Sequence, residues 1–238
     1  LALSFSAMTP KSIQFLLDIK FARFLVSWVC HPNTVFHNMA VDRMKILSRH
    51  KLIWEDIERF GGVEKLRDTI SRQMESPNPD LDLVYSLLEL LTFLVDAKWP
   101  RSSLMKKGVP QVLIKHFVKH PNKKFVSVTL HILGYFMAEE EGFNIVAESG
   151  IVPSIYDEEI ADGVQVFLSR ICSTEAGRKL SVQWFLTPET YHPMGAALLL
   201  RRGGAVFLAK NALLVLQQAK GFNVALNIAS YPLALSCT

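Results

Sequence analysis

The sequence lacks the marks of a secreted or disulfide-stabilised protein. Its 238 residues contain three cysteines, Cys30, Cys172 and Cys237, which are odd in number, far apart and without the spacing of a metal site. No Asn-X-Ser/Thr glycosylation acceptor occurs. Disulfides and glycans belong to oxidising compartments, so we expect a cytoplasmic or nuclear protein.

Sequence motifs of catalysis are also lacking. No Gly-X-Ser-X-Gly occurs, and Gly203-Gly204 is not followed by the Gly-Lys-Ser/Thr of a phosphate loop. His116 and His120 have a spacing that can hold a metal on a helix, but no Glu, Asp or Cys near them in the sequence completes a site. We therefore predict no catalytic residue, no metal and no cofactor, and expect that the protein is not an enzyme.

Neither end of the chain has the pattern of a membrane segment or a leader. Gly221 to Thr238 is uncharged over 18 residues, but two asparagines and a proline interrupt it, which favours a buried terminal helix over a membrane span. The first residues, LALSFSAMTP, lack an initiating Met and a basic n-region. We expect a fragment of a longer protein rather than a signal peptide.

Acidic residues are absent from Ala97 to Ala138, where Lys and Arg contribute eight positive charges. The net charge of the whole chain is +4, so the rest of the chain carries −4. This segregation defines a basic patch on and around a predicted helix from Pro110 to His120, with two interpretations: a solvated face, or a dock for nucleic acid or an acidic partner. The patch consists of Lys106, Lys107, Lys115, Lys119, Lys123 and Lys124.

The apolar residues recur with a helical period throughout, and no strand-period segment of useful length is present, so the fold is predicted to be all-α. Pro-Asn recurs at steps of 45 and 44 residues (Pro32, Pro77, Pro121), and Gly followed by Val or Ile at steps of 46 and 42 (Gly62, Gly108, Gly150). Such periods are typical of helical solenoids. The predicted helices include Lys11 to Trp28, Thr34 to His50, Ile53 to Phe60, Val63 to Glu75, Leu81 to Ala97, Lys123 to Ala138 and Val164 to Cys172, with a break at Pro100.

An apolar helix follows Gly-Val, and then come an Asn-containing break, a long helix and a short helix ending in Glu-Ser-Gly-Ile. This order resembles armadillo repeats, most closely over Pro121 to Ile151. The resemblance implies one right-handed α-solenoid of about five three-helix repeats. The expected units are 1–31, 32–76, 77–120, 121–187 and 188–238, with a bend or missing segments around 155–163.

In armadillo proteins the long helix lines a concave groove and presents Trp, with Asn four residues later, to a bound peptide. The corresponding positions here carry no such ladder, because they begin with Asp42 and Ile46. The resemblance instead implies a partner-binding groove with acidic, aromatic and basic parts. Its predicted residues are Glu89, Phe93, His131, Tyr135, Arg170 and Lys210. The alternative interpretation of Phe93 and Tyr135 is ordinary core between repeats.

The favoured function is therefore a non-catalytic protein–protein interaction scaffold that binds a peptide or helical segment of a partner in this groove or at an apolar end. The apolar C-terminal unit indicates a second contact, with another copy, another protein or more of the same chain. The alternative function is an adaptor for nucleic acid or acidic surfaces that uses the basic block 98–124. No transmembrane segment is predicted.

Overall fold

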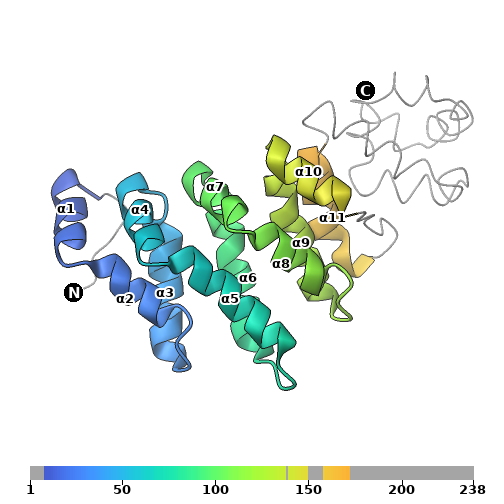
Figure 1. The fold of residues 1–238 in the computed structure, drawn as a ribbon, viewed down its shortest axis with the longest axis horizontal. Helices are drawn as coiled ribbons and strands as arrows, with labels where there is room; N and C mark the ends of the chain where they lie inside the picture. Colours follow the sequence, from blue (N-terminus) through green and yellow to red (C-terminus); the bar gives the residue numbers. More distant parts are fainter. Residues whose placement is uncertain (1–7, 138, 150–157, 172–238) are drawn as a thin grey trace, which may run out of the picture. The chain divides into compact units, whose positions relative to one another are not determined.

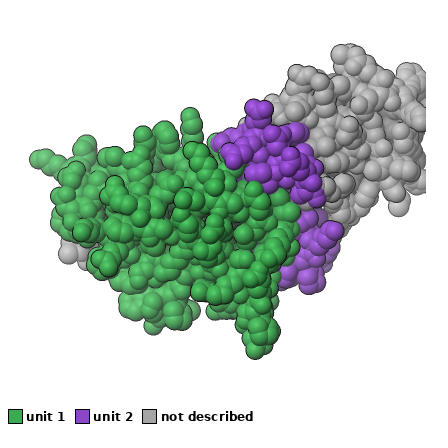
Figure 2. Space-filling model, viewed as in Figure 1, with its two compact units in different colours: residues 1–116 green, residues 117–238 purple. Residues whose placement is uncertain are grey.

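The computed structural model describes residues 8–137, 139–149 and 158–171, which form helices joined by short turns and contain no strand. The chain divides into two compact units, Leu1–His116 and Phe117–Thr238 (Figure 2). None of the described helices is long and apolar enough to cross a membrane. The all-α prediction is confirmed.

Three kinds of helix follow one another in a fixed order, so the repeat is visible in the helix lengths. A short helix of nine residues comes first, a middle helix second, and a long helix of 14 residues third. The short helices are α1 (Pro10–Asp18), α4 (Lys51–Arg59), α7 (Lys98–Lys106) and α10 (Glu140–Glu148). The middle helices are α2 (Phe21–Trp28), α5 (Gly62–Glu75) and α8 (Val109–Phe117), and the long helices are α3 (Thr34–Leu47), α6 (Leu81–Leu94) and α9 (Lys123–Phe136). A 3₁₀ turn, η2 (Glu158–Ile160), leads into α11 (Ala161–Ile171).

Each long helix begins at a polar side chain that caps its first turn. The side-chain oxygens of Asn33, Asp80 and Asn122 accept hydrogen bonds from backbone N–H groups at 2.9, 3.0 and 3.0 Å. In the second repeat the Pro-Asn marker does not coincide with the cap, because Asn78 lies in the turn before it. Asp80 is the residue that caps α6, and Thr9 caps α1, accepting from the N–H of Ser12 at 3.2 Å.

A left-handed residue separates the short helix from the middle helix in each of the first three repeats. Lys20, Gly61 and Gly108 have φ values of 53°, 73° and 76°. The prediction of one helix from Lys11 to Trp28 was therefore wrong, because the chain reverses at Lys20 between α1 and α2. The repeat partner of Gly108 is Gly61, not the neighbouring Gly62 on which the sequence spacing was counted.

The segment after α6 also differs from its prediction. Pro100 does not break a helix; it is the third residue of α7, in the first turn, where a proline leaves no hydrogen bond unmade. The helix α6 ends at Leu94, before the predicted Ala97. The helices predicted at 176–185, 196–202, 205–218 and 222–230 lie outside the described residues, as does the apolar C-terminal unit.

Unit 1 has two layers, with the middle helices α2 and α5 in front of the long helices α3 and α6 (Figure 1). The long helix α6 buries most of its apolar side chains between its neighbours, whereas Asp82, Glu89 and Phe93 are exposed. Its core side chains have no exposed surface: Val84, Leu87, Leu88, Leu90, Leu91 and Leu94.

In unit 2 the helices α9 and α11 pack closely. A Cβ atom at Gly134 would lie 2.8 Å from the Cα of Phe167, so the absence of a side chain is what permits this approach.

Candidate functional site

The long helices α3 and α6 pack side by side in unit 1 and present one shared face, here called the α3–α6 face. The ninth residue of each long helix is Asp42 in α3, Glu89 in α6 and His131 in α9. The thirteenth is Ile46, Phe93 and Tyr135 in the same order. The two sets of predicted groove positions are therefore structurally equivalent from repeat to repeat.

These positions are not used by the core of unit 1. Asp42 and Glu89 are exposed, Ile46 is 38% exposed and Phe93 is 47% exposed. The interpretation of Phe93 as ordinary core is therefore wrong. The ammonium of Lys45, on α3, lies 4.7 Å from the centroid of the Phe93 ring, a cation–π contact that joins the two helices at this end of the face.

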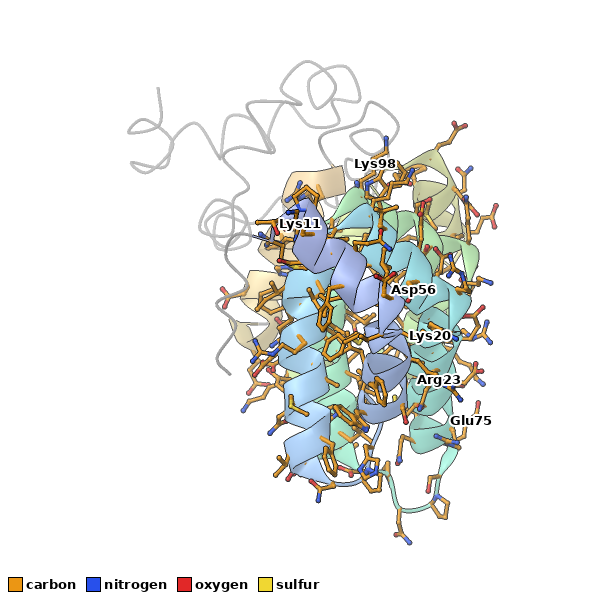
Figure 3. All side chains as sticks on the ribbon, turned by 90° about the vertical axis from the view of Figure 1, so that its left-hand side faces the viewer. Lys11, Lys20, Arg23, Asp56, Glu75 and Lys98 are labelled. Atoms are coloured by element: carbon orange, nitrogen blue, oxygen red, sulfur yellow. The ribbon has the colours of Figure 1, made fainter. Side chains whose placement is uncertain are left out.

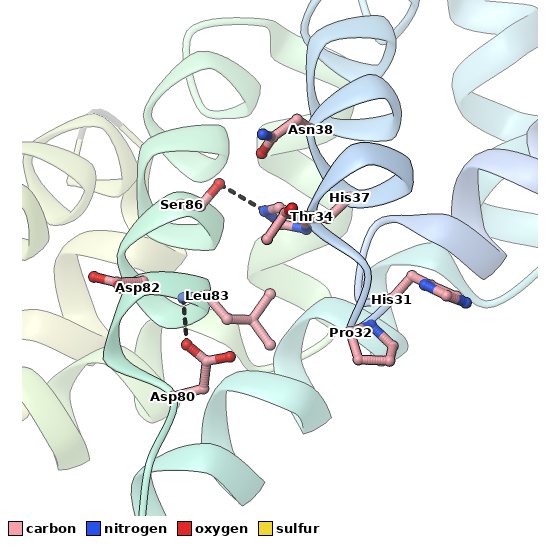
Figure 4. Close-up of a pocket in the computed structure, with 9 residues that line it drawn as sticks. All are labelled: His31, Pro32, Thr34, His37, Asn38, Asp80, Asp82, Leu83 and Ser86. Atoms are coloured by element: carbon pink, nitrogen blue, oxygen red, sulfur yellow. Dashed lines mark hydrogen bonds between the residues drawn. The ribbon is translucent and has the colours of Figure 1, made fainter.

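At the other end of the face, a pocket of about 290 Å³ lies where α3 and α6 begin (Figure 4). The buried ring of His37 forms its inner wall: Nδ1 is 2.7 Å from the carbonyl oxygen of Val29, and Nε2 is 2.7 Å from the hydroxyl of Ser86. The remaining lining residues come from both helix starts and the turns before them: His31, Pro32, Thr34, Asn38, Asp80, Asp82 and Leu83.

Four carboxylates give the α3–α6 face a negative charge. Asp80 and Asp82 line the pocket, and Asp42 and Glu89 lie one to two helical turns further along. In the described part of the chain, no Lys, Arg or His lies within ion-pair distance of any of the four. An exposed acidic face with a half-exposed aromatic ring at one end is suited to a segment that carries both positive and apolar side chains.

The predicted groove residues of unit 2 form a separate cluster. The rings of His131 and Tyr135 stack at 5.5 Å, and the guanidinium of Arg170 lies 4.2 Å from the Tyr135 ring centroid. Burial, and secondarily the positive charge of Arg170, lowers the pKa of His131. The structure thus brings these three residues together, whereas Lys210 lies outside the described residues.

The basic patch is partly neutralised by acidic residues of α5. The ammonium of Lys107 lies 2.6 Å from Glu64, and that of Lys115 lies 2.7 Å from Glu75. A hydrogen bond from each lysine lowers the pKa of its glutamate partner, and the bond to Glu64 raises the pKa of Lys107. Lys106, Lys119, Lys123 and Lys124 are exposed. The acid-free stretch of sequence is therefore not free of acidic neighbours in the fold.

The sequence analysis predicted Glu89 and Phe93 as groove positions but did not indicate the pocket or its two aspartates. A signal was present, because Asp80 stands 47 residues after Asn33, and Asn122 stands 42 residues after Asp80, as equivalent helix caps. The repeat register was counted instead on Pro77-Asn78, which hid the equivalence. No sequence pattern indicated that His37 would be buried and bonded to Ser86.

Similar solved structures agree with this helix order. A designed armadillo repeat protein in complex with the peptide (KR)4 has a TM-score of 0.56 at 12% identity, covering 98% of this chain and 87% of that one. A second designed armadillo repeat protein has a TM-score of 0.53 at 13% identity, with 95% and 85% covered. The fold is that of armadillo repeats.

A further engineered protein is similar over a smaller share of its own length. It has a TM-score of 0.53 at 14% identity, covering 96% of this chain and 60% of that one. No protein-family model matches the sequence, and no curated protein matches it. At these identities the likeness concerns the armadillo fold, and the chemistry of the site has to be argued from the residues of this chain.

Proposed function

We propose that the protein is a non-catalytic interaction scaffold that binds a Lys- or Arg-containing segment of a partner protein on the α3–α6 face. The observation that carries the proposal is the set of four carboxylates, Asp42, Asp80, Asp82 and Glu89, without an ion-pair partner among the described residues. A cationic segment would supply the missing charges, and its apolar side chains would cover Phe93.

Two further observations support this proposal. The shared fold includes a designed armadillo repeat protein that was solved with a (KR)4 peptide. Asp42, Glu89 and Phe93 also lie outside the core of unit 1, since both acidic residues are exposed and Phe93 is half-exposed. Large apolar side chains left exposed beside unpaired charges are typical of binding surfaces. Such a scaffold would act in the cytosol or nucleus.

The basic patch has weaker support as a docking site, because Lys107 and Lys115 already have carboxylate partners. The α3–α6 face is therefore the proposed site. An acidic peptide, which the basic patch would bind, is included in the test.

The proposal is tested by fluorescence anisotropy with labelled octapeptides, one of alternating Lys and Arg and one of alternating Glu and Asp. The whole chain is compared with an Asp42→Asn/Glu89→Gln variant and with a control, Glu140→Gln/Glu141→Gln, which removes the same charge from exposed positions of α10. Two exposed ion pairs at 0.2–1 kcal/mol each predict binding of the basic peptide that is about 2- to 30-fold weaker in the site variant.

Binding of the basic peptide should also weaken as salt is raised, because exposed charges are screened. The control variant should bind like the unaltered chain. Equal binding of the acidic and basic peptides, or equal losses in the site variant and the control, would refute the proposal.

A further inference from the structure

One end of unit 1 carries a cluster of aromatic side chains, of which His31 also lines the pocket where α3 and α6 begin. The rings of Phe24 and Trp28 on α2 are 5.8 Å apart, Trp28 stacks on Phe36 of α3 at 5.3 Å, and His31 meets the edge of Phe36 at 5.3 Å. Figure 3 looks onto this end, which is formed by α1, α2 and α3. We call it the α1–α3 end.

The cluster continues into an exposed apolar surface. Of the eleven large hydrophobic side chains found exposed in the described residues, six lie on α1, its C-cap, α2 and the first half of α3: Phe15, Ile19, Phe24, Val35, Phe36 and Met39. Phe15, Phe24 and Phe36 are 59%, 48% and 39% exposed. An aromatic side chain contributes about 150–250 Å², so these three rings alone expose roughly 300 Å². That area is already comparable with the largest apolar patch of a typical monomer.

The repeats themselves show what covers this surface elsewhere in unit 1. Phe15 is the sixth residue of α1, and the sixth residues of α4 and α7 are Asp56 and Ser103. Those two are only 4% and 7% exposed. Ser103 is covered by the preceding short helix, because Trp54 of α4 donates a hydrogen bond from Nε1 to its hydroxyl at 3.1 Å. In the later repeats the side chain at this position is therefore covered by a helix. In the first repeat the position holds Phe15, a large apolar side chain that is exposed.

The charges beside the α1–α3 end have one predominant sign. Three cations are exposed there and are labelled in Figure 3: Lys11 on α1, Lys20 at the junction of α1 and α2, and Arg23 on α2. Asp18 is the acidic residue among them. None of the three cations has an ion-pair partner among the described residues. A complementary occupant is therefore acidic along one edge.

We propose that the α1–α3 end is a docking site for an amphipathic helix of a partner protein, with its apolar stripe on the Phe24–Trp28–Phe36 cluster and Phe15, and with acidic residues facing Lys11, Lys20 and Arg23. The helix takes the place that α1 takes on α4. The exposed side chains of this end have the apolar character of an internal contact between repeats. Docking of a helix by its apolar face is a common mode of recognition.

The probes are two designed helical peptides of about 18 residues, roughly 27 Å long, with identical apolar stripes of Leu and Ala. One carries Glu and Gln on its polar face, and the other carries Lys and Gln. Fluorescence anisotropy is measured with the whole chain and with Phe24→Ser/Phe36→Ser. The matched control is Leu52→Ser/Trp99→Ser, which removes side chains that are 55% and 45% exposed elsewhere in unit 1. Circular dichroism verifies that each variant is folded, and sedimentation velocity gives its oligomeric state.

The acidic helix is expected to bind, and the Phe24→Ser/Phe36→Ser variant to bind it at least about tenfold more weakly, since central aromatic contacts dominate such interfaces. The control and a Phe36→Leu variant should retain binding of the acidic helix. Binding of the basic helix, which suits the α3–α6 face, should be the same in the unaltered chain and in Phe24→Ser/Phe36→Ser. Failure of the acidic helix to bind, or an equal loss in the control, would overturn the proposal. So would a dimer of the unaltered chain that Phe24→Ser/Phe36→Ser dissociates, because the occupant would then be a second copy.

Discussion

The left-handed conformation of Lys20 leads to a prediction that a single substitution raises stability. Gly61 and Gly108 occupy the equivalent junctions with φ values of 73° and 76°, whereas Lys20 has a Cβ atom at φ 53°. A non-glycine residue in this region costs about 1–2 kcal/mol. Glycine costs about 0.5–1 kcal/mol through the greater freedom of the unfolded chain. Lys20→Gly should therefore raise the free energy of unfolding by about 0.5–1 kcal/mol.

The side chain of Lys20 is exposed and makes no hydrogen bond or ion pair in the described structure, so its removal should cost little. Urea unfolding followed by circular dichroism at 222 nm measures the change. Lys20→Ala separates the two causes, because it removes the charge and keeps the Cβ atom. A gain in Lys20→Ala as large as that in Lys20→Gly would assign the effect to charge, and a loss of stability in Lys20→Gly would refute the backbone argument.

Three further predictions concern other contacts. His37→Ala removes two hydrogen bonds made by a buried ring, so the urea midpoint should fall by the equivalent of about 2–3 kcal/mol, while an unchanged midpoint would contradict the contacts to Val29 and Ser86. Gly134→Ala places a Cβ atom 2.8 Å from the Cα of Phe167 and should cost about 1–3 kcal/mol, seen as faster amide exchange in α9 and α11 and not in α3. The hydrogen bond from Lys107 lowers the pKa of Glu64, so this pair stabilises the fold above the pKa of an unfolded glutamate and the contribution is lost as pH falls through the folded pKa. Carbon-13 NMR titration of the Glu64 carboxyl should show its pKa rise in Lys107→Met, and an unmoved pKa would refute the coupling.

The sequence predicted the helical repeat because the repeat depends on local features that survive in the residues. Asn33 and Asn122 mark the starts of α3 and α9, Gly108 marks the turn before α8, and the long helices keep their apolar period. N-caps and left-handed turns restrict residue type through the backbone, so they can be recognised without tertiary information. The order of the helices and the all-α fold class could therefore be predicted from the sequence.

The errors in the predicted helix boundaries and caps arose at positions that hold a residue type other than the one usually found there. Lys20 takes a left-handed conformation that is usually occupied by glycine, so no sequence marker indicated a break between α1 and α2. Asp80 caps α6 although the nearby Pro77-Asn78 has the more typical marker. In both positions tertiary packing sets the register and the local preference gives way.

The residues of the candidate site could not be predicted in this way, because folding does not restrict which residue types occupy these positions. The fourth position of the long helices is His37, Val84 and Val126, buried in all three, and the eleventh is Met44, Leu91 and Leu133, fully buried in all three. The ninth position varies instead from Asp42 to Glu89 to His131, and the thirteenth from an aliphatic to an aromatic side chain. A position that faces outward in every repeat can change without loss of the core, so its chemistry is available for binding.

This difference explains why the fold could be predicted and the partner could not. The core positions follow an apolar period that any armadillo sequence must satisfy. The residue type at an outward position depends instead on what binds to the surface. The charge of the α3–α6 face becomes visible when Asp80 and Asp82 are brought beside Asp42 and Glu89 by packing of helices that are far apart in the chain. The same packing places Glu64 and Glu75 against the basic patch and reduces its charge. Binding surfaces of a repeat protein therefore have to be found from the neighbours that the fold creates, since the sequence alone shows the basic patch without the acidic residues that lie beside it.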